Sequence, residues 1–121
     1  MKRVLIVDDH DLFREVLATV LEQDTYLEQN VQAGSLAEAR QLLRGLGGNI
    51  DLAIVDADLP NGEGAEMIRE LREVDVPVLA LTLGQSLQAR ARAVRAGAAE
   101  VFSTAASGEE IVRAAERLVG G

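Results

Sequence analysis

Acidic residues stand at two points where a short apolar run of the sequence stops. Asp8 and Asp9 follow the run 4–7, and Asp56 follows the run 53–55. Both runs are too short for helices, and turn-forming residues bound the second, so we interpret each as a buried strand. Strands that are apolar on both faces are typical of a parallel sheet covered by helices. Ligands of such sheets bind beyond the carboxyl ends of the strands, which is where these carboxylates fall.

The chemistry expected from these carboxylates is phosphoryl transfer. Carboxylates a few ångströms apart repel, and one takes up a proton unless a cation holds them together. Mg²⁺ suits a site with one or two carboxylates, a carbonyl and several waters, and it typically presents a phosphate oxygen to a nucleophile. A carboxylate can itself accept a phosphoryl group, which gives an aspartyl phosphate. Thr82, which ends the apolar run 78–81, could donate a hydrogen bond to that group.

Each acidic residue taken alone has a simpler interpretation. Asp9 or Asp11 by itself is more typical of a helix cap than of a ligand, and Asp56 could cap its own loop. His10 is interpreted as a solvated loop residue. Acids and a hydroxyl at three separate strand ends are harder to explain by capping, so the combination favours the functional interpretation.

Helices are expected between the strands, most of them opened by a capping residue. Asp11 can cap the first and Ser86 the fourth, and capping boxes at 35–38 and 107–110 open the second and fifth. The third helix is expected over 65–73. The buried face of the first helix is expected to consist of apolar residues that recur at spacings of three and four: Leu12, Val16, Leu17, Val20 and Leu21.

The sequence as a whole predicts an α/β fold of five parallel strands that alternate with five helices. The remaining strands are expected at 31–33 and 100–102, and right-handed crossovers place helices on both faces of the sheet. A flavodoxin-like, doubly wound sheet of order 2-1-3-4-5 is a natural solution at this size. In that order the first and third strands flank the switch point, so the carboxylates converge there. The whole chain, 1–121, is expected to be one domain.

Composition excludes several classes of protein. Twelve basic and 20 acidic residues give a net charge of −8, which disfavours nucleic-acid binding and favours cations or basic partners. The chain has no cysteine, so thiol catalysis, thiolate metal sites and disulfides are excluded. No stretch approaches the roughly 20 apolar residues that cross a bilayer, and the apolar run near the start is too short for a signal peptide. A cytoplasmic location without membrane contact is expected.

Two motifs resemble those of the receiver domains of bacterial two-component response regulators (CheY-like), most closely the NarL/FixJ type. The segment 7–14 is similar to the opening motif of that family, and the segment 56–60 is similar to its phosphoacceptor motif. The resemblance covers almost the whole chain. It implies that a histidine kinase phosphorylates Asp56.

The same resemblance implies the other site residues and the partners. Mg²⁺ would be held by Asp9, Asp56 and the backbone carbonyl of Asp58, Asp8 would assist through water, and Thr82 would be the switch hydroxyl. NarL/FixJ-type proteins usually carry a helix-turn-helix DNA-binding domain after the receiver. The chain is therefore expected to be a single-domain protein or the N-terminal part of a longer regulator, whose output domain or partner protein would control transcription. A homodimer is left open.

The chain departs from the family pattern at the phosphoryl pocket. Alignment of Gly97-Ala98 with the family's glycine-alanine pair places Thr104 where the family has a lysine that contacts the phosphoryl group. The single lysine, Lys2, lies about 20 Å from Asp8 at the other end of its strand, at a rise of about 3.3 Å per residue. Loss of a charged hydrogen bond costs about 1.5–3 kcal/mol, of which a neutral hydroxyl recovers only part. Phosphorylation is therefore expected to be weakened.

Two further departures concern the switch. Leu83 follows Thr82 where the family prefers a small residue, and it is expected to crowd the phosphoryl pocket. Val101 stands where the family has an aromatic switch residue, and Phe102 lies one position later. Strand alternation sends the side chains of Val101 and Phe102 to opposite faces, so Phe102 is not expected to substitute for the aromatic residue.

Three functions are compatible with the sequence. The first is a phosphorylation-dependent switch, in which Thr82 reorients toward phosphorylated Asp56 and the surface near the fourth helix and fifth strand changes its affinity for a partner. The second is an atypical receiver that acts as a phosphorylation-independent interaction or dimerisation module, which the departures at the phosphoryl pocket favour. The third is a small phosphatase, because residues 56–58 resemble the DxD nucleophile motif of haloacid-dehalogenase-type enzymes. The missing lysine and the short chain argue against the third, and the protein is not expected to be an enzyme.

Overall fold

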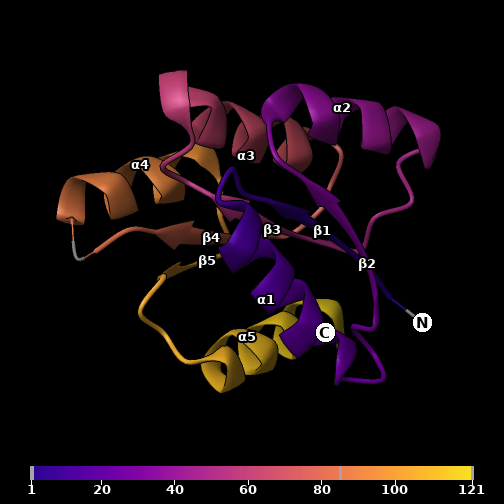
Figure 1. Ribbon diagram of the computed structural model, residues 1–121. Helices are drawn as coiled ribbons and strands as arrows, with labels where there is room; N and C mark the ends of the chain where they lie inside the picture. The colour runs from indigo at the N-terminus through magenta and orange to yellow at the C-terminus, as the bar shows by residue number, and fades with distance from the viewer. Residues whose placement is uncertain (1, 85, 121) are drawn as a thin grey trace.

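The computed structural model describes residues 2–84 and 86–120 and contains a five-stranded parallel sheet with helices on both faces (Figure 1). The strand order is β2-β1-β3-β4-β5, which confirms the predicted doubly wound α/β fold. The strands are β1 (Arg3–Val7), β2 (Gln29–Ala33), β3 (Leu52–Asp56), β4 (Val78–Thr82) and β5 (Glu100–Ser103). The helices are α1 (Asp11–Glu22), α2 (Leu36–Gly45), α3 (Glu63–Glu73), α4 (Leu87–Ala96) and α5 (Gly108–Gly120), with a 3-10 turn at Pro60–Gly62.

The sheet separates two apolar layers. Helices α2, α3 and α4 cover one face, and α1 and α5 cover the other (Figure 1). In β3, Ala53 and Val55 belong to the first layer, and Leu52 and Ile54 belong to the second. Burial of both faces explains why β1, β3 and β4 read as continuous apolar runs in the sequence, whereas the edge strand β2 is partly exposed and contains polar residues. Within the described part of the chain, none of the covering helices is long and apolar enough to cross a membrane.

Strand β3 lies at the centre of the sheet, between β1 and β4. All of its residues are buried, including Asp56 at its end. Val55 is in register with Val7 of β1, and Asp56 is in register with Leu81 of β4. The segments that follow these three strands therefore leave the sheet side by side. This register brings the sequence-predicted acids and Thr82 to one edge of the molecule.

The expected buried face of α1 is only partly correct. Leu17 and Leu21 are buried as predicted, together with Ala18, but Leu12 is 76% exposed and Val16 is 53% exposed. Helix α1 begins beyond the carboxyl end of β1, so its first turns extend past the sheet and its later turns pack on it. Periodicity alone identifies an apolar stripe, whereas the part of the stripe that is covered depends on where the helix meets the sheet.

The predicted serine caps are confirmed, and the predicted cap at Asp11 is wrong. The chain leaves β1 through His10 in an extended conformation (φ −91°, ψ 96°), so His10 occupies the cap position of α1. Asp11 is instead the first residue of the helix, where its carboxylate pairs with Arg14 at 3.0 Å. At the starts of α2, α4 and α5 a serine hydroxyl accepts the N–H of the residue three positions later; these serines are Ser35 (3.1 Å), Ser86 (3.2 Å) and Ser107 (3.1 Å).

The connection after β3 is more ordered than the sequence predicts. The glycine-containing segment 60–64 is predicted as a loop with the helix starting at Ala65. The structure has the 3-10 turn Pro60–Gly62 there, and α3 already begins at Glu63. Asn61 adopts a left-handed conformation with φ 60°, which asparagine accepts more readily than most residues. The chain thus turns sharply and starts α3 close to the end of β3.

Candidate functional site

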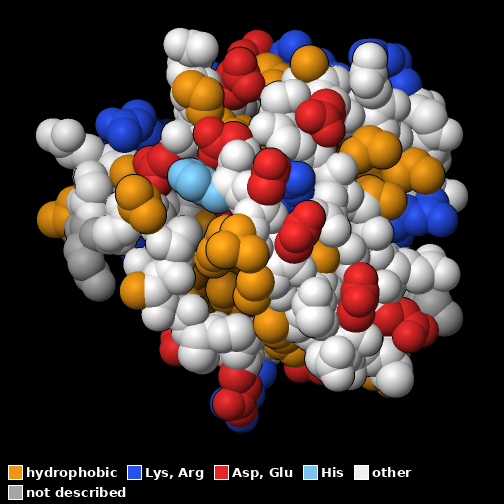
Figure 2. Space-filling model, in the orientation of Figure 1, with side chains coloured by type: hydrophobic (Ala, Val, Ile, Leu, Met, Phe, Trp, Pro, Cys, Tyr) orange, Lys and Arg blue, Asp and Glu red, His pale blue; other side chains and the backbone are white. Residues whose placement is uncertain are grey.

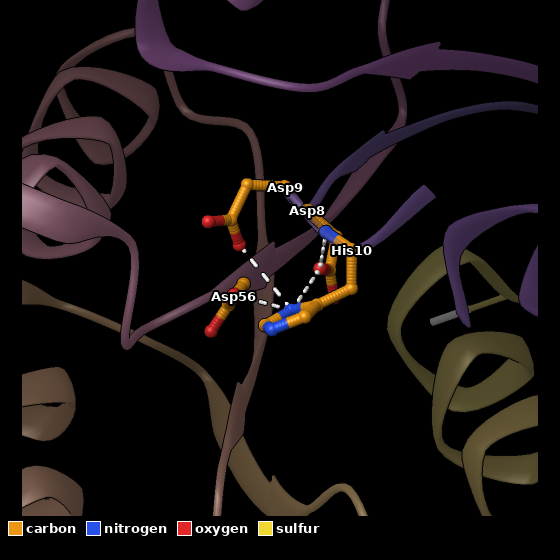
Figure 3. Close-up of side chains that lie close together, drawn as sticks. All are labelled: Asp8, Asp9, His10 and Asp56. Atoms are coloured by element: carbon orange, nitrogen blue, oxygen red, sulfur yellow. Dashed lines mark hydrogen bonds and ion pairs between the residues drawn. The ribbon is translucent and has the colours of Figure 1, made fainter. Parts of the chain in front are cut away.

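Four side chains meet at the carboxyl ends of β1 and β3. They are Asp8, Asp9 and His10, which follow β1, and Asp56, the last residue of β3 (Figure 3). Each offers a possible ligand atom, and these atoms all lie within 4.8 Å of one another. Asp8 and Asp56 are 3% and 5% exposed, whereas Asp9 and His10 are exposed. The structure therefore brings together the three carboxylates that the sequence analysis singled out.

His10 lies among these carboxylates, so its interpretation as a solvated loop residue is incomplete. Its Nδ1 is 3.0 Å from Asp8, 3.3 Å from Asp9 and 3.8 Å from Asp56 (Figure 3). Its backbone N–H also donates to the Asp8 carboxylate, at 2.8 Å. The hydrogen bond to Asp8 and the negative charge of Asp9 raise the pKa of His10 above its usual value. A protonated imidazole balances part of the local negative charge.

Burial raises the pKa of Asp56 to about 6. The backbone N–H of Asp58 donates to the Asp56 carboxylate at 2.8 Å and opposes this increase, whereas the charges of Asp8 and Asp58 add to it. Without a cation, the site disfavours the charged form of Asp56. A bound cation would reverse that preference because it offsets both the desolvation and the repulsion.

The donor set fits Mg²⁺. Asp8, Asp9 and Asp56 present carboxylate oxygens, which are the ligands that hard divalent cations take. Two of the three are buried, so their charges are poorly hydrated and gain from a cation. The Nδ1 of His10 already shows where positive charge is favourable, since it lies within 3.8 Å of all three carboxylates. The type of the ligand atoms and their burial therefore support Mg²⁺ binding at this cluster.

A glycine supports the turn that carries Asp56. A Cβ atom at Gly64 would lie 2.6 Å from the carbonyl oxygen of Asp56 and 2.7 Å from that of Ala57. Real Cβ atoms do not approach backbone oxygens this closely. Glycine at position 64 therefore allows the first turn of α3 to rest directly on the end of β3.

A cavity of about 640 Å³ opens beside the acidic cluster. Thr104 and Leu83 line it together with Asp56 and Asp58, so the position expected for the family lysine does face the site. Leu83 is 69% exposed, which places it at the rim. Figure 2 shows apolar side chains on the surface next to the single exposed histidine, His10.

Thr82 and Thr104 lie on neighbouring segments of the sheet edge. Thr82 is 3% exposed at the end of β4, and the backbone N–H of Thr104 donates to its carbonyl oxygen at 2.9 Å. Lys2 precedes β1 and lines a separate cavity with Tyr26 and Glu116. The single lysine therefore lies at the opposite end of the sheet, as the sequence predicts.

Val101 and Phe102 point to opposite faces of the sheet, as strand alternation predicts. Val101 is buried in the layer under α3 and α4, and Phe102 packs in the layer of α1 and α5. The position expected for the family's aromatic switch residue thus holds a buried aliphatic side chain. Arg90 of α4 donates to the carbonyl oxygen of Val101 at 3.2 Å, which ties α4 to β5.

Sequence reasoning missed the contribution of Arg14. Its Nη1 donates to the carbonyl oxygen of Asp8 at 2.6 Å, and its Nε donates to Gln32 of β2 at 3.1 Å. The guanidinium therefore fixes the backbone at the end of β1, where the acidic pair begins. Arg14 and His10 both fall within the segment 7–14, which resembles the family's opening motif. Their position in that motif was the one indication in the sequence that they belong to the site.

The fold and the site together define a class of protein. It is the class of doubly wound α/β domains that carry a buried carboxylate cluster at the switch point between β1 and β3. The family model of the response regulator receiver domain matches residues 4–116. The chain belongs to this family.

Curated relatives include regulators of transcription. The chain is 36% identical over 123 residues to the DNA-binding transcriptional activator DevR/DosR of Mycobacterium tuberculosis, and the alignment covers 100% of this chain and 56% of DevR/DosR. The chain spans about half the length of the curated relatives that it matches.

Solved structures of receiver domains superpose closely on the chain. The signal receiver domain of the putative response regulator NarL from Mycobacterium tuberculosis has a TM-score of 0.84 and 27% identity, with 99% of this chain and 97% of that chain covered. A response regulator from Burkholderia pseudomallei, solved with a phosphorylated aspartic acid, a calcium ion and citrate, has a TM-score of 0.80 and 31% identity. That match covers 94% of this chain and 66% of the other.

Proposed function

We propose that the chain is a phosphorylation-dependent signalling switch whose phosphoryl acceptor is Asp56. The observation that carries this proposal is the convergence of two buried carboxylates, Asp8 and Asp56, with Asp9 beside an open cavity. Two buried carboxylates so close together are costly for stability, so a functional role explains their presence better than a structural one. The Burkholderia relative with a phosphorylated aspartic acid and a calcium ion supports the same chemistry.

Each residue of the site has a proposed role. A carboxylate oxygen of Asp56 attacks the phosphorus of a phosphohistidine, so that a P–O bond forms while the P–N bond breaks. Asp9, Asp56 and the backbone carbonyl of Asp58 would hold Mg²⁺, with Asp8 assisting through water. The ion would supply positive charge to offset that of the transferring group. The Thr82 hydroxyl donates to the phosphoryl oxygens once they are in place, and Thr104 offers a second, neutral donor.

The partners of the proposed switch follow from its family. The phosphoryl donor is a histidine kinase, and the recipient of the signal is an output domain or a partner protein that controls transcription. The receiver chain itself, at a net charge of −8, does not bind DNA. The chain forms a single receiver domain that works in the cytoplasm.

An amide NMR titration with Mg²⁺ and then beryllofluoride, a mimic of the aspartyl phosphate, tests the proposal. We expect shifts around Asp9, Asp56 and Thr82 that spread to Val101, and we expect Asp56→Asn to abolish the beryllofluoride response. Asp75→Asn is the matched control, because Asp75 is exposed in the turn between α3 and β4, at the other end of the sheet. A wild-type spectrum that ignores beryllofluoride at saturating Mg²⁺ would refute phosphorylation at Asp56.

Replacement of Thr104 by lysine is expected to strengthen the site. The position faces the cavity beside Asp56, so a lysine there restores a charged donor to the phosphoryl group. A charged hydrogen bond is worth about 1.5–3 kcal/mol, so we expect beryllofluoride to bind at least about tenfold more tightly to Thr104→Lys. Thr25→Lys adds the same charge at an exposed turn after α1 and is expected to bind like the wild type. Unchanged affinity in Thr104→Lys would mean that this side chain does not reach the acceptor site.

A second candidate function is a phosphorylation-independent interaction module. It is favoured by the buried Val101 and by the Arg90 contact that holds α4 against β5, because both fix the surface that would otherwise move. Sedimentation equilibrium with and without beryllofluoride separates the two functions. A dimer that forms equally well in both conditions supports the module, whereas a beryllofluoride-dependent change in association supports the switch.

A further inference from the structure

The carboxylate of Asp58 makes a contact that the proposed metal and phosphoryl chemistry does not use. Its Oδ2 accepts the backbone N–H of Leu83 at 2.6 Å. Asp58 lies on the turn after β3 and Leu83 follows β4, so the bond joins two neighbouring loops. Both residues line the cavity that contains Asp56. A carboxylate acceptor makes this bond stronger than one between neutral groups.

The Leu83 N–H is a donor that an anion on Asp56 would need. A phosphoryl group carries about two negative charges and three acceptor oxygens, and backbone N–H groups at the ends of elements are common donors to such groups. Asp56 is in register with Leu81, which is two residues before Leu83. The backbone N–H of Leu83 therefore lies close to the end of β3, where Asp56 is. In the unphosphorylated protein, the carboxylate of Asp58 already accepts the Leu83 N–H.

The negative charge of Asp58, like its hydrogen bond to Leu83, opposes the binding of a phosphoryl group in the cavity. Four carboxylates line the cavity, and His10 is the only basic residue among the described lining residues. Asp58 and Asp56 line the same cavity, so their negative charges repel each other. An incoming phosphoryl group meets the same repulsion, and Thr104 supplies no positive charge to offset it.

We propose that the Asp58 carboxylate is an internal anion that competes with a phosphoryl group for the Leu83 N–H and thereby holds Leu83, directly after β4, in its unphosphorylated position. The proposal rests on the proposed function, because the competitor is the phosphoryl group on Asp56. Phosphorylation breaks the bond between Asp58 and Leu83, and Leu83 is released from Asp58 only when the phosphoryl group takes the place of the carboxylate. Asp58 is thus a positioning residue that sets the threshold of the switch, in addition to the role proposed for its backbone carbonyl.

Three variants test this competition. Asp58→Ala removes both the acceptor and the charge, and Asp58→Asn keeps an acceptor oxygen without the charge. Asp75→Asn is the matched control, since it removes the same charge from an exposed turn remote from the cavity. Asparagine also tolerates the left-handed conformation of position 75, where φ is 60°. Two quantities are measured in each protein: the proton shift and hydrogen-exchange rate of the Leu83 amide without metal, and the affinity for beryllofluoride at saturating Mg²⁺.

We expect the Leu83 amide of Asp58→Ala to move upfield and to exchange faster than in the wild type. Beryllofluoride is expected to bind about tenfold more tightly to Asp58→Ala, because a charged hydrogen bond no longer has to be broken. Asp58→Asn is expected to fall between the two, and Asp75→Asn to match the wild type. The Mg²⁺ affinity of each protein is measured separately, so that a change in metal binding is not mistaken for a change in anion binding.

The outcomes separate this proposal from the proposed function. If the wild type responds to beryllofluoride and both Asp58 variants bind it no more tightly, the competition is refuted and the phosphorylation site stands. If the wild type does not respond and Asp58→Ala does, the competition is supported, and phosphorylation of the wild-type chain at Asp56 is refuted. If every protein is silent, both proposals fail. Should Asp58→Ala not fold, Asp58→Asn alone decides, because it differs from the wild type only in a carboxamide.

Discussion

Asp56→Asn is expected to make the metal-free protein more stable at neutral pH, by about 2 kcal/mol. Burial raises the pKa of Asp56 from 3.8 to about 6 in the folded state, and each pKa unit corresponds to about 1.4 kcal/mol, which gives an upper bound of about 3 kcal/mol. Part of this gain is lost because asparagine is a weaker acceptor than the carboxylate for the Asp58 N–H, which donates to Asp56 at 2.8 Å.

The stabilisation has a defined dependence on pH. Between pH 4 and 6 the folded state holds a proton on Asp56 that the unfolded state has released, so the contribution of Asp56 to the stability of the wild type falls as pH rises through this window. Asparagine does not titrate, so the difference between the two proteins grows from about pH 4 to about pH 7 and is then constant. His10 titrates in both proteins, and for this reason the difference is the quantity to compare.

Urea denaturation of both proteins from pH 4 to pH 8 without metal measures this difference. Asp75→Asn, which removes an exposed carboxylate, controls for the change in net charge. Added Mg²⁺ is expected to reverse the order, because it stabilises the wild type and has little effect on Asp56→Asn. A variant less stable than the wild type at pH 7.5 without metal would show that the Asp56 carboxylate is not under strain.

Gly64→Ala is expected to destabilise the fold by about 1–3 kcal/mol, the usual cost of overpacking a tight contact, and to weaken Mg²⁺ binding. The added Cβ would lie 2.6 Å from the Asp56 carbonyl oxygen and 2.7 Å from that of Ala57. These are backbone atoms of the turn that carries the site, so they cannot move aside as a flexible side chain can. Displacement of the turn shifts both the Asp56 carboxylate and the Asp58 carbonyl relative to the acids that follow β1.

Gly45→Ala provides the matched control for this change. Gly45 lies in α2 with no atom within 4 Å of an added Cβ, so alanine there is expected to stabilise the helix by about 0.5–1 kcal/mol. Urea denaturation and Mg²⁺ titration of the two variants measure both effects. If Gly64→Ala retained wild-type stability and Mg²⁺ affinity, the close packing of α3 on β3 would be irrelevant to the site.

Strands β1, β3 and β4 and the polar residues at their ends could be predicted from the sequence, because each of these strands is an apolar run that stops at a polar residue. The serine caps of α2, α4 and α5 were equally predictable, since a cap depends on residues three positions apart. The start of α3 was not, because the 3-10 turn at Pro60–Gly62 depends on the packing of Gly64 against the end of β3.

By itself the sequence determined the fold, the order of the strands and the three carboxylates at the switch point, since these follow from local apolar patterns and a small set of allowed topologies. The tertiary structure decided that Leu12 of α1 is exposed beside the cavity, that His10 lies among the carboxylates, and that Asp58 bonds Leu83 across two loops. Each of these features depends on how segments distant in sequence meet at the sheet edge. Local periodicity does not predict these contacts, because the contacts are set by the register of β1, β3 and β4.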